Sequence, residues 1–430
     1  MVGCKWVFKL KHNSDGSISR YRARLVAKGF HQQYGVDFEK TFSLVIKPPI
    51  VRIILSLAVQ FNWPLRQLDV RNTFLHGFLR EEVYMVQPFG YVNPVFPNHV
   101  CRLWKSLYGL KQAPRAWFDR FSTQLLHMGF EASLADSSLF ILKQGKVLVY
   151  PLVYVNDIVL TSNQPNFLTS LIKQLSQAFE LKDLGPLHYF LGIHITRTSK
   201  GLFLSQTKYA HDLLVKHNML SSKPARSPCA PNLRPVPHEG SILPNPHQYR
   251  SMVGSLHYLT FTRLDLSFVV HQVCQFKTTP TDAHLVATKR IMRYINGTSN
   301  FRIFLQPGSL SLSTFSDSNW VGDPFDRRST TGFLVYIGYN PITWSAKKQD
   351  TMSQSSTESE YRALATITTE LCWLRQILKD LGIFLAFPPK LWCDNVSALT
   401  IASNPMFHAC TKHVEVDNHF CAREGTSLRP

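Results

Sequence analysis

The sequence predicts a multidomain chain of mixed α+β and α/β class, and two observations carry this prediction. Residues 1–222 alternate apolar, β-branched runs with amphipathic helical segments. From about residue 310, three strand-like runs, a long helix, another strand and further helices follow one another. A stretch rich in Pro and Ser separates the two blocks, and a chain of 430 residues has room for two or three domains.

The first block contains two predicted helices and a predicted hairpin. "VRIILSLAVQFN" (51–62) is apolar on all sides and predicts a buried helix, whereas "FLTSLIKQLSQAFEL" (167–181) predicts an exposed one. "RQLDVRNTFLHG" (66–77) predicts a short strand that ends near Asp69. "VLVYPLVYVNDIVLTS" (147–162) predicts two strands joined at a polar pair.

The middle of the chain predicts a linker and two helices. Residues 221–250, "SSKPARSPCAPNLRPVPHEGSILPNPHQYR", are too rich in Pro to sustain a helix or an inner strand. Residues 249–276 and 282–298 each have the pattern of a helix. We therefore expect three domains: 1–222, then a Pro-rich linker and helical connection over 223–309, and 310–430.

The last block predicts a β-strand-rich start followed by helices. Its elements in order are strands at 313–322, 331–338 and 341–349, a long helix from Thr357 to Leu381, a strand at 390–395, and helices at 397–404 and 411–424. This order of three strands, helix, strand and helices matches the βββαβα arrangement of the RNase H fold.

Composition favours a polyanionic partner. The chain carries 47 Lys and Arg against 28 acids, a formal charge of +19, and nucleic acid is the usual partner of such a surface. A basic surface that only faces solvent is the alternative. The sequence shows neither a signal peptide nor an apolar run long enough to cross a membrane, so we expect an intracellular protein, cytoplasmic or nuclear. The oligomeric state is left open.

The cysteines predict reduced thiols, because the eight are scattered without a CxxC pair. One segment, "HACTKHVEVDNHFC" (408–421), gathers His and Cys residues whose spacing matches no familiar zinc finger. Helical packing is the favoured interpretation of this segment.

Two carboxylates of the first block raise the question of a metal site. Asp69 ends a strand and Asp157 lies at the hairpin, so two neighbouring strands would bring them together. A pair of Mg²⁺ ions needs several carboxylate oxygens. A strand-end Asp is also a common cap, and Asn156-Asp157 is also a good tight-turn pair because both residues tolerate positive φ.

Five motifs occur in order: "RYRARLVAKGFHQQYGVDFEKTFS", "LRQLDVRNTFLHGFLREEVYMVQPFGY", "CRLWKSLYGLKQAPRAWFDRF", "LVYVNDIVL" and "LGPLHYFLGIHI". Together they strongly resemble the reverse transcriptase of copia-type LTR retrotransposons, and the resemblance covers nearly the whole chain. It implies a right-hand polymerase with fingers and palm that copies an RNA template from a DNA primer, using dNTPs. It also implies two Mg²⁺ ions per site, with Mn²⁺ as a substitute.

The resemblance assigns residues to the polymerase site. Asp69 and Asp157 would be palm carboxylates that bind metal, and Phe74 would exclude a ribose 2′-OH by its bulk; a core aromatic is the alternative. Tyr108 and Gly109 would lie under the incoming nucleotide, where Gly permits close backbone approach.

Basic residues would contact phosphates. Lys111 would meet the template, and Arg22, Arg24 and Lys28 would hold the triphosphate unless they form only a solvated basic face. Residues 189–195, "YFLGIHI", resemble the primer grip.

Asn156 departs from the family. The family pattern at 154–157 is Tyr-x-Asp-Asp, and this chain has Asn at the third position. An amide is neutral and offers one oxygen, so the formal charge of the site falls from about −3 to −2. We expect the hairpin to survive and the chemistry to be impaired.

The resemblance extends to the last block, where it implies a second metal site that cleaves the RNA of an RNA–DNA hybrid. Asp317, Glu360 and Asp394 would share two Mg²⁺ ions. The alternatives are a capping box from Thr357 to Glu360 and an N-cap at Asp394-Asn395. Asp317 is unfavourable inside a strand without a reason.

Two arginines of this block, Arg327 and Arg328, would touch the hybrid backbone or would lie in an exposed turn. In the family a fourth carboxylate follows, on a closing helix preceded by a strand. We expect the RNase H-like domain of this chain to be truncated before both, and the fingers to be shortened. The sequence thus predicts a copy impaired at both sites; a non-catalytic nucleic-acid-binding remnant is the alternative.

Overall fold

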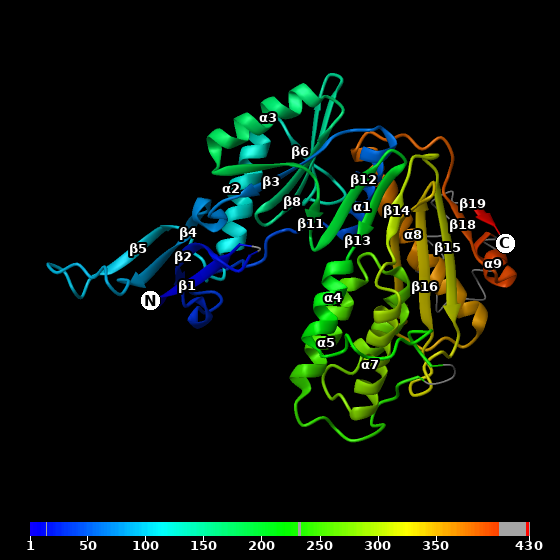
Figure 1. The fold of residues 1–430 in the computed structure, drawn as a ribbon. Helices are drawn as coiled ribbons and strands as arrows, with labels where there is room; N and C mark the ends of the chain where they lie inside the picture. Colours follow the sequence, from blue (N-terminus) through cyan, green and yellow to red (C-terminus); the bar gives the residue numbers. More distant parts are fainter. Residues whose placement is uncertain (14, 231–233, 404–426, 430) are drawn as a thin grey trace. The chain divides into compact units, whose positions relative to one another are not determined.

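The computed structural model describes residues 1–13, 15–230, 234–403 and 427–429 (Figure 1). The chain divides into two compact units, one of Met1–Ile46 with Pro64–Pro186, the other of Lys47–Trp63 with Leu187–Pro430. In the described part of the chain, no helix combines the length and the apolarity that a membrane crossing requires.

The first unit contains most of the first block, which was predicted over residues 1–222. Its elements are β1 (Cys4–His12), β2 (Ile18–Ala27), η1 (Gly29–His31), β3 (Leu65–Val70), η2 (Thr73–His76), β4 (Phe78–Val86), β5 (Val100–Lys105), α2 (Ala113–His127), β6 (Glu131–Ala132), β7 (Phe140–Gln144), β8 (Val147–Tyr154), β9 (Asp157–Ser162), α3 (Pro165–Ala178) and β10 (Leu181–Pro186).

A six-stranded sheet in the order β10-β3-β9-β8-β7-β6 forms the centre of this unit. The predicted hairpin is β8 and β9, and β3 pairs antiparallel with β9. Helix α3 buries Leu168, Leu171, Ile172 and Leu175 against this sheet, which is the spacing of one helical face. Two further pairs, β1 with β2 and β4 with β5, are separate two-stranded sheets.

The second unit contains the predicted helices of the connection and the last block, which begins near residue 310. Its elements are α1 (Pro48–Gln60), β11 (Tyr189–Phe190), β12 (Ile193–Thr198), β13 (Gly201–Ser205), α4 (Thr207–Lys216), α5 (Pro246–Leu259), η3 (Leu264–Leu266), α6 (Ser267–Cys274), α7 (Asp282–Gly297), β14 (Ile303–Leu305), β15 (Leu312–Asn319), β16 (Thr330–Ile337), β17 (Asn340–Lys348), α8 (Ser356–Asp380), β18 (Lys390–Trp392), α9 (Val396–Ser403) and β19 (Ser427–Arg429).

The larger sheet of this unit has the order β17-β16-β15-β18-β19. Its central strand β15 is antiparallel to β16 and parallel to β18, and α8 packs against it. The sheet has a fifth strand, β19, parallel to β18. The expectation that the strand after this region is missing was therefore wrong. The helix expected at 411–424 and the His and Cys residues of 408–421 lie outside the described residues.

The helix expected over 249–276 is divided into α5 and α6, and this prediction was wrong at its centre. The carbonyls at the end of α5 are bound by side chains, because Arg52 Nη1 donates to Phe261 O at 2.7 Å and Trp344 Nε1 donates to Thr260 O at 3.2 Å. These tertiary contacts take the carbonyl oxygens that a continuous helix would need.

The prediction that residues 221–250 form no helix was wrong at their end, because residues 246–250 begin α5; the described residues of this Pro-rich stretch before α5 contain no helix and lie along α7. Ala225 N donates to Arg293 O at 3.1 Å, and Ser241 N donates to the Asp282 carboxylate at 2.9 Å. A buried His284 on α7 is within 2.9 Å of the Val236 carbonyl. This stretch is thus part of the second unit and not a free linker.

Candidate metal centres and nucleic-acid surface

The predicted hairpin brings two carboxylates together. Tyr154 ends β8 and pairs with Asp157, the first residue of β9, so Val155 and Asn156 form the turn. On the other side of β9, Asp69 of β3 is the register partner of Asp157. Both carboxylates are partly exposed at this end of the sheet.

The turn is held in a conformation that was explained wrongly from the sequence. The residue with positive φ is Val155, at 54°, whereas neither Asn156 nor Asp157 has a positive φ. A β-branched residue pays a steric cost there. Two hydrogen bonds to main-chain carbonyls fix the turn. The Trp117 side chain donates from Nε1 to Val155 O at 2.7 Å, and Val70 N donates to Asn156 O at 2.9 Å.

The side chain of Asn156 binds a predicted metal ligand. Its Nδ2 donates to Asp69 Oδ1 at 2.7 Å. Burial, and then the negative charge of Asp69, raise the pKa of Asp157. The centre therefore has two carboxylates close together and an amide donor in contact with one of them. Carboxylate oxygens are the donors that Mg²⁺ prefers, so Asp69 and Asp157 fit a divalent ion, while the amide N–H does not.

The side chains of Phe74, Tyr108 and Arg24 pack against one another. The rings of Phe74 and Tyr108 meet edge to face with centroids 5.0 Å apart, and the Arg24 guanidinium lies 4.9 Å from the Tyr108 centroid. Phe74 is half-buried and packs against the hydrophobic core. The Arg24 Nε is buried without a hydrogen-bond partner among the described residues.

Gly109 has a structural reason for having no side chain. Its φ is +93°, and a Cβ there would come within 2.1 Å of Ala27 O. Ala27 N also donates to Tyr108 O at 2.7 Å, so the segment around Gly109 is packed on the end of β2. This close approach is to the chain itself.

The remaining predicted cations of the first unit lie on β2 and near α2. Lys111 Nζ donates to Gln32 O at 2.8 Å and lies 5.0 Å from the Phe38 ring centroid. Arg22 and Arg24 are on β2, and Lys28 follows it. None of these four forms an ion pair with a carboxylate of the described residues, so their charge is available to a ligand.

The predicted primer grip, residues 189–195, comprises β11, the turn of Leu191 and Gly192, and the start of β12. Leu191 and Gly192 both have positive φ, of 50° and 67°. The Tyr258 hydroxyl donates to Leu191 O at 2.5 Å and fixes this turn. The turn belongs to the second unit.

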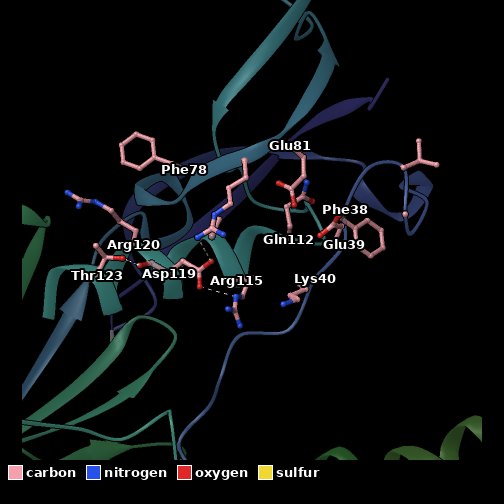
Figure 2. Close-up of a pocket in the computed structure, with 14 residues that line it drawn as sticks. Phe38, Glu39, Lys40, Phe78, Glu81, Gln112, Arg115, Asp119, Arg120 and Thr123 are labelled. Carbon is pink, nitrogen blue, oxygen red and sulfur yellow. Dashed lines mark hydrogen bonds and ion pairs between the residues drawn. The ribbon is translucent and has the colours of Figure 1, made fainter. Parts of the chain in front are cut away.

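A pocket of about 630 Å³ in the first unit combines arginines with an exposed aromatic ring (Figure 2). It lies between the segment before Lys40, strand β4 and helix α2. Asp119 of α2 accepts from Arg115 at 2.9 Å and lies 3.6 Å from Arg80. The Arg120 guanidinium lies 5.8 Å from the centroid of Phe78, which is 56% exposed.

These pocket residues were not predicted individually from the sequence. The signal was present in "APRAWFDRF", where Arg115 and Asp119 have the i,i+4 spacing of a helical ion pair. Cations beside an exposed ring are typical of surfaces that bind single-stranded nucleic acid.

In the other unit, two of the three predicted carboxylates, Glu360 and Asp394, lie within 4.8 Å of each other, and the charge of the third, Asp317, acts on Glu360. Asp317 is exposed on β15, Glu360 is buried on α8, and Asp394 is exposed just after β18. Glu360 Oε1 accepts from Ser318 N at 2.8 Å. Burial, followed by the charges of Asp317 and Asp394, raises the pKa of Glu360 to about 7. Like charges that crowd a buried carboxylate are the arrangement a cation relieves.

Of the two capping alternatives, the capping box from Thr357 to Glu360 was wrong, whereas the N-cap at Asp394-Asn395 is confirmed for Asn395. Helix α8 is capped by Ser355, whose side chain accepts from Glu358 N at 3.1 Å. Helix α9 is capped by Asn395, which accepts from Ala398 N at 2.9 Å. Glu360 and Asp394 therefore cap neither helix.

A thiol was missed in the sequence. Cys393 is 3% exposed, and its Sγ lies 3.9 Å from Glu360 Oε2. Donor atoms of Glu360, Cys393 and Asp394 lie within 4.8 Å of one another. Burial raises the pKa of Cys393 to about 11, so the thiol is protonated at neutral pH. Its position beside Asp394 in "LWCDN" was the available signal.

Arg327 and Arg328 are exposed in the turn region between β15 and β16, a position that is compatible with contact to a hybrid backbone and does not test it. Arg327 has φ 59°, and Arg328 lies 3.6 Å from Asp326. Lys348 contacts Asp323 and Asp326 at 2.6 and 2.7 Å and fixes the turn.

Comparison with known proteins gives one family. The sequence profile described as "Reverse transcriptase (RNA-dependent DNA polymerase)" matches residues 1–231. The chain is 50% identical over 421 residues to the retrovirus-related Pol polyproteins from transposons RE1 and RE2 of Arabidopsis thaliana. It is 38% identical over 429 residues to that from transposon TNT 1-94 of Nicotiana tabacum. The matches cover 97–98% of this chain but only 29–32% of each relative.

Proposed function

Because the chain belongs to the reverse transcriptase (RNA-dependent DNA polymerase) family, we propose that it is the polymerase and RNase H part of a copia-type retrotransposon Pol polyprotein. The observation that carries the polymerase proposal is the register of β3 and β9, which sets Asp69 opposite Asp157. Residues 1–222 would supply the fingers, palm and primer grip, 223–309 the connection, and 310–430 the RNase H domain.

Asp69 and Asp157 would hold Mg²⁺, two ions in the intact family, with Mn²⁺ as a substitute. The bound ion supplies charge stabilisation at the reacting phosphate. Phe74, packed edge to face on Tyr108, would stand against the sugar and exclude a 2′-OH. Arg22, Arg24 and Lys28 would bind the triphosphate of the dNTP.

The pocket of Figure 2 would receive the single-stranded RNA template. Arg120 and the exposed Phe78 offer a cation and a stacking face, and Lys111 would contact a template phosphate. Residues 189–195 would contact the DNA primer.

Asn156 would impair the first centre. Its amide donates to Asp69 Oδ1. The N–H group occupies the lone pair of that oxygen, which a metal ion would need for coordination. This contact is the specific observation that favours the second candidate function, a non-catalytic protein that still binds nucleic acid.

The RNase H part would use Asp317, Glu360 and Asp394 to hold Mg²⁺ and cut the RNA of an RNA–DNA hybrid. The support is the crowding of these carboxylates and the sheet order β17-β16-β15-β18-β19 around them. Arg327 and Arg328 would contact the hybrid backbone from their exposed turn. The expected site of action is intracellular, cytoplasmic or nuclear.

The test is a pair of assays on the purified full chain. Labelled hybrid of a DNA primer on a longer RNA template is titrated at several salt concentrations, and the same hybrid is incubated with Mg²⁺ and dNTPs to measure primer extension and RNA cleavage. We expect binding that weakens steeply with salt and extension that is weak or absent. Binding that is indifferent to salt, or absent, would overturn the nucleic-acid assignment itself.

A further inference from the structure

The second unit contains an apolar pocket far in sequence from both carboxylate centres. It has a volume of about 620 Å³ and lies between α6, α7 and the Pro-rich stretch before α5. Val269 and Val273 of α6 line it together with Ala287 and Ile291 of α7. This volume is within the range of sites that bind small organic molecules.

The charges around this pocket are unbalanced. Of its described lining residues, Arg234, Lys289, Arg290 and Arg293 are cationic, and only Glu239 is acidic. None of the four cations forms an ion pair with a described carboxylate. The pocket therefore combines an apolar interior with an uncompensated positive charge.

Arg290 has an unused donor. Its Nη2 donates to Ser227 Oγ at 3.0 Å, but its Nε is buried and has no hydrogen-bond partner among the described residues. A buried N–H without an acceptor is costly, and a charged donor more so. The guanidinium lines the pocket, so an anionic group bound there would balance its charge.

We propose that this pocket binds a small amphipathic anion, with its apolar body between α6 and α7 and its carboxylate or sulfonate head at Arg290. Charge decides among occupants, because a cationic amphiphile of the same size would meet four like charges. A neutral one would leave the positive charge of the lining unbalanced. This site is independent of the polymerase and RNase H proposals, and neither depends on it.

The test is calorimetric titration of the full chain with two probes of equal chain length, dodecanoate and dodecyltrimethylammonium, both below their micelle concentrations. We expect dodecanoate to bind with one site per chain and at least about tenfold more tightly than the cation. Arg290→Met keeps the apolar stem and should weaken dodecanoate about tenfold or more. The matched control is Arg226→Met, an exposed arginine outside the pocket, which should leave the affinity unchanged.

Two further variants keep the result decisive. Ala287→Trp fills the cavity and should abolish binding. If that variant does not fold, Val286→Asp at the 67% exposed rim should weaken dodecanoate selectively, with Val286→Thr as its uncharged control. Equal binding of both probes, undiminished binding by a folded Ala287→Trp, or no binding of dodecanoate at all would overturn the proposal.

Discussion

Replacing Asn156 by Asp should make the metal-free protein less stable and make its stability respond to Mg²⁺. The change removes the 2.7 Å hydrogen bond from the amide to Asp69. It also adds a third carboxylate beside Asp69 and Asp157, where burial and a neighbouring charge already raise the pKa of Asp157.

The magnitude follows from two terms. A hydrogen bond to a charged group contributes about 1.5–3 kcal/mol. Two unit charges 4 Å apart near a protein surface repel by up to about 4 kcal/mol, and solvent and protonation reduce this. We expect the free energy of unfolding without metal to fall by about 2–4 kcal/mol.

Mg²⁺ should reverse this loss, because an ion that binds only the folded state stabilises it by about 2.7 kcal/mol at a hundredfold excess over its Kd. The assay is scanning calorimetry of both proteins with and without Mg²⁺. Asn156→Ala is the control, since it removes the hydrogen bond but adds no charge and should show no new Mg²⁺ response. An Asn156→Asp protein that is as stable as the original without metal, or equally insensitive to Mg²⁺, would contradict this prediction.

Four other predictions concern separate parts of the chain. Because the pKa of Glu360 is raised in the folded state, the metal-free protein should lose stability as pH rises from about 4.5 to 7; Glu360→Gln should remove about 1–3 kcal/mol of that dependence in denaturant titrations. Arg52→Met should cost about 2–4 kcal/mol, measured by thermal unfolding, because the buried guanidinium donates to two main-chain carbonyls. Gly109→Ala should destabilise the first unit by more than about 3 kcal/mol, whereas Gly129→Ala, also at positive φ but with its Cβ only in ordinary contact with Leu142 Cδ1 at 3.6 Å, should cost only about 1 kcal/mol. Hybrid affinity should fall by at least about tenfold between 50 and 200 mM salt, as measured by fluorescence anisotropy.

Sequence periodicity was sufficient for much of the local structure. The β8–β9 hairpin has alternating or continuous apolar runs around a polar turn, and α8 has a clear helical face, so both were predicted close to their observed bounds. The sequence also predicted that Asp69 and Asp157 lie close together, because each is at the end of a predicted strand.

Features that depend on tertiary contacts could not be predicted in this way. Helix α1 packs with β17 in the second unit, where Arg52 donates to Ile342 O at 2.7 Å across 290 residues of sequence. The cap of α8 is Ser355 and not Thr357, because the helix begins at Ser356, two residues earlier than a cap at Thr357 would require. The positive φ of Val155 is imposed by the hairpin against the propensity of its own residue type.

The hydrogen bond that Asn156 forms could not be predicted from the sequence either. Substitution of an acid by an amide indicates a lost ligand, but only the structure shows that the amide N–H binds the remaining carboxylate. The same holds for Cys393, whose place beside Glu360 depends on the packing of α8 against the sheet.

The most direct test of the account is Mg²⁺-dependent primer extension on an RNA template by three proteins: the chain as it is, Asn156→Asp, and Asn156→Asp with Asp69→Asn. Equal folding and equal hybrid binding are checked first. We expect Asn156→Asp to raise the extension rate by at least about a hundredfold, equivalent to about 2.7 kcal/mol, and Asp69→Asn to abolish the gain. Strong extension by the unchanged chain, or a gain that survives the loss of the Asp69 carboxylate, would contradict this expectation.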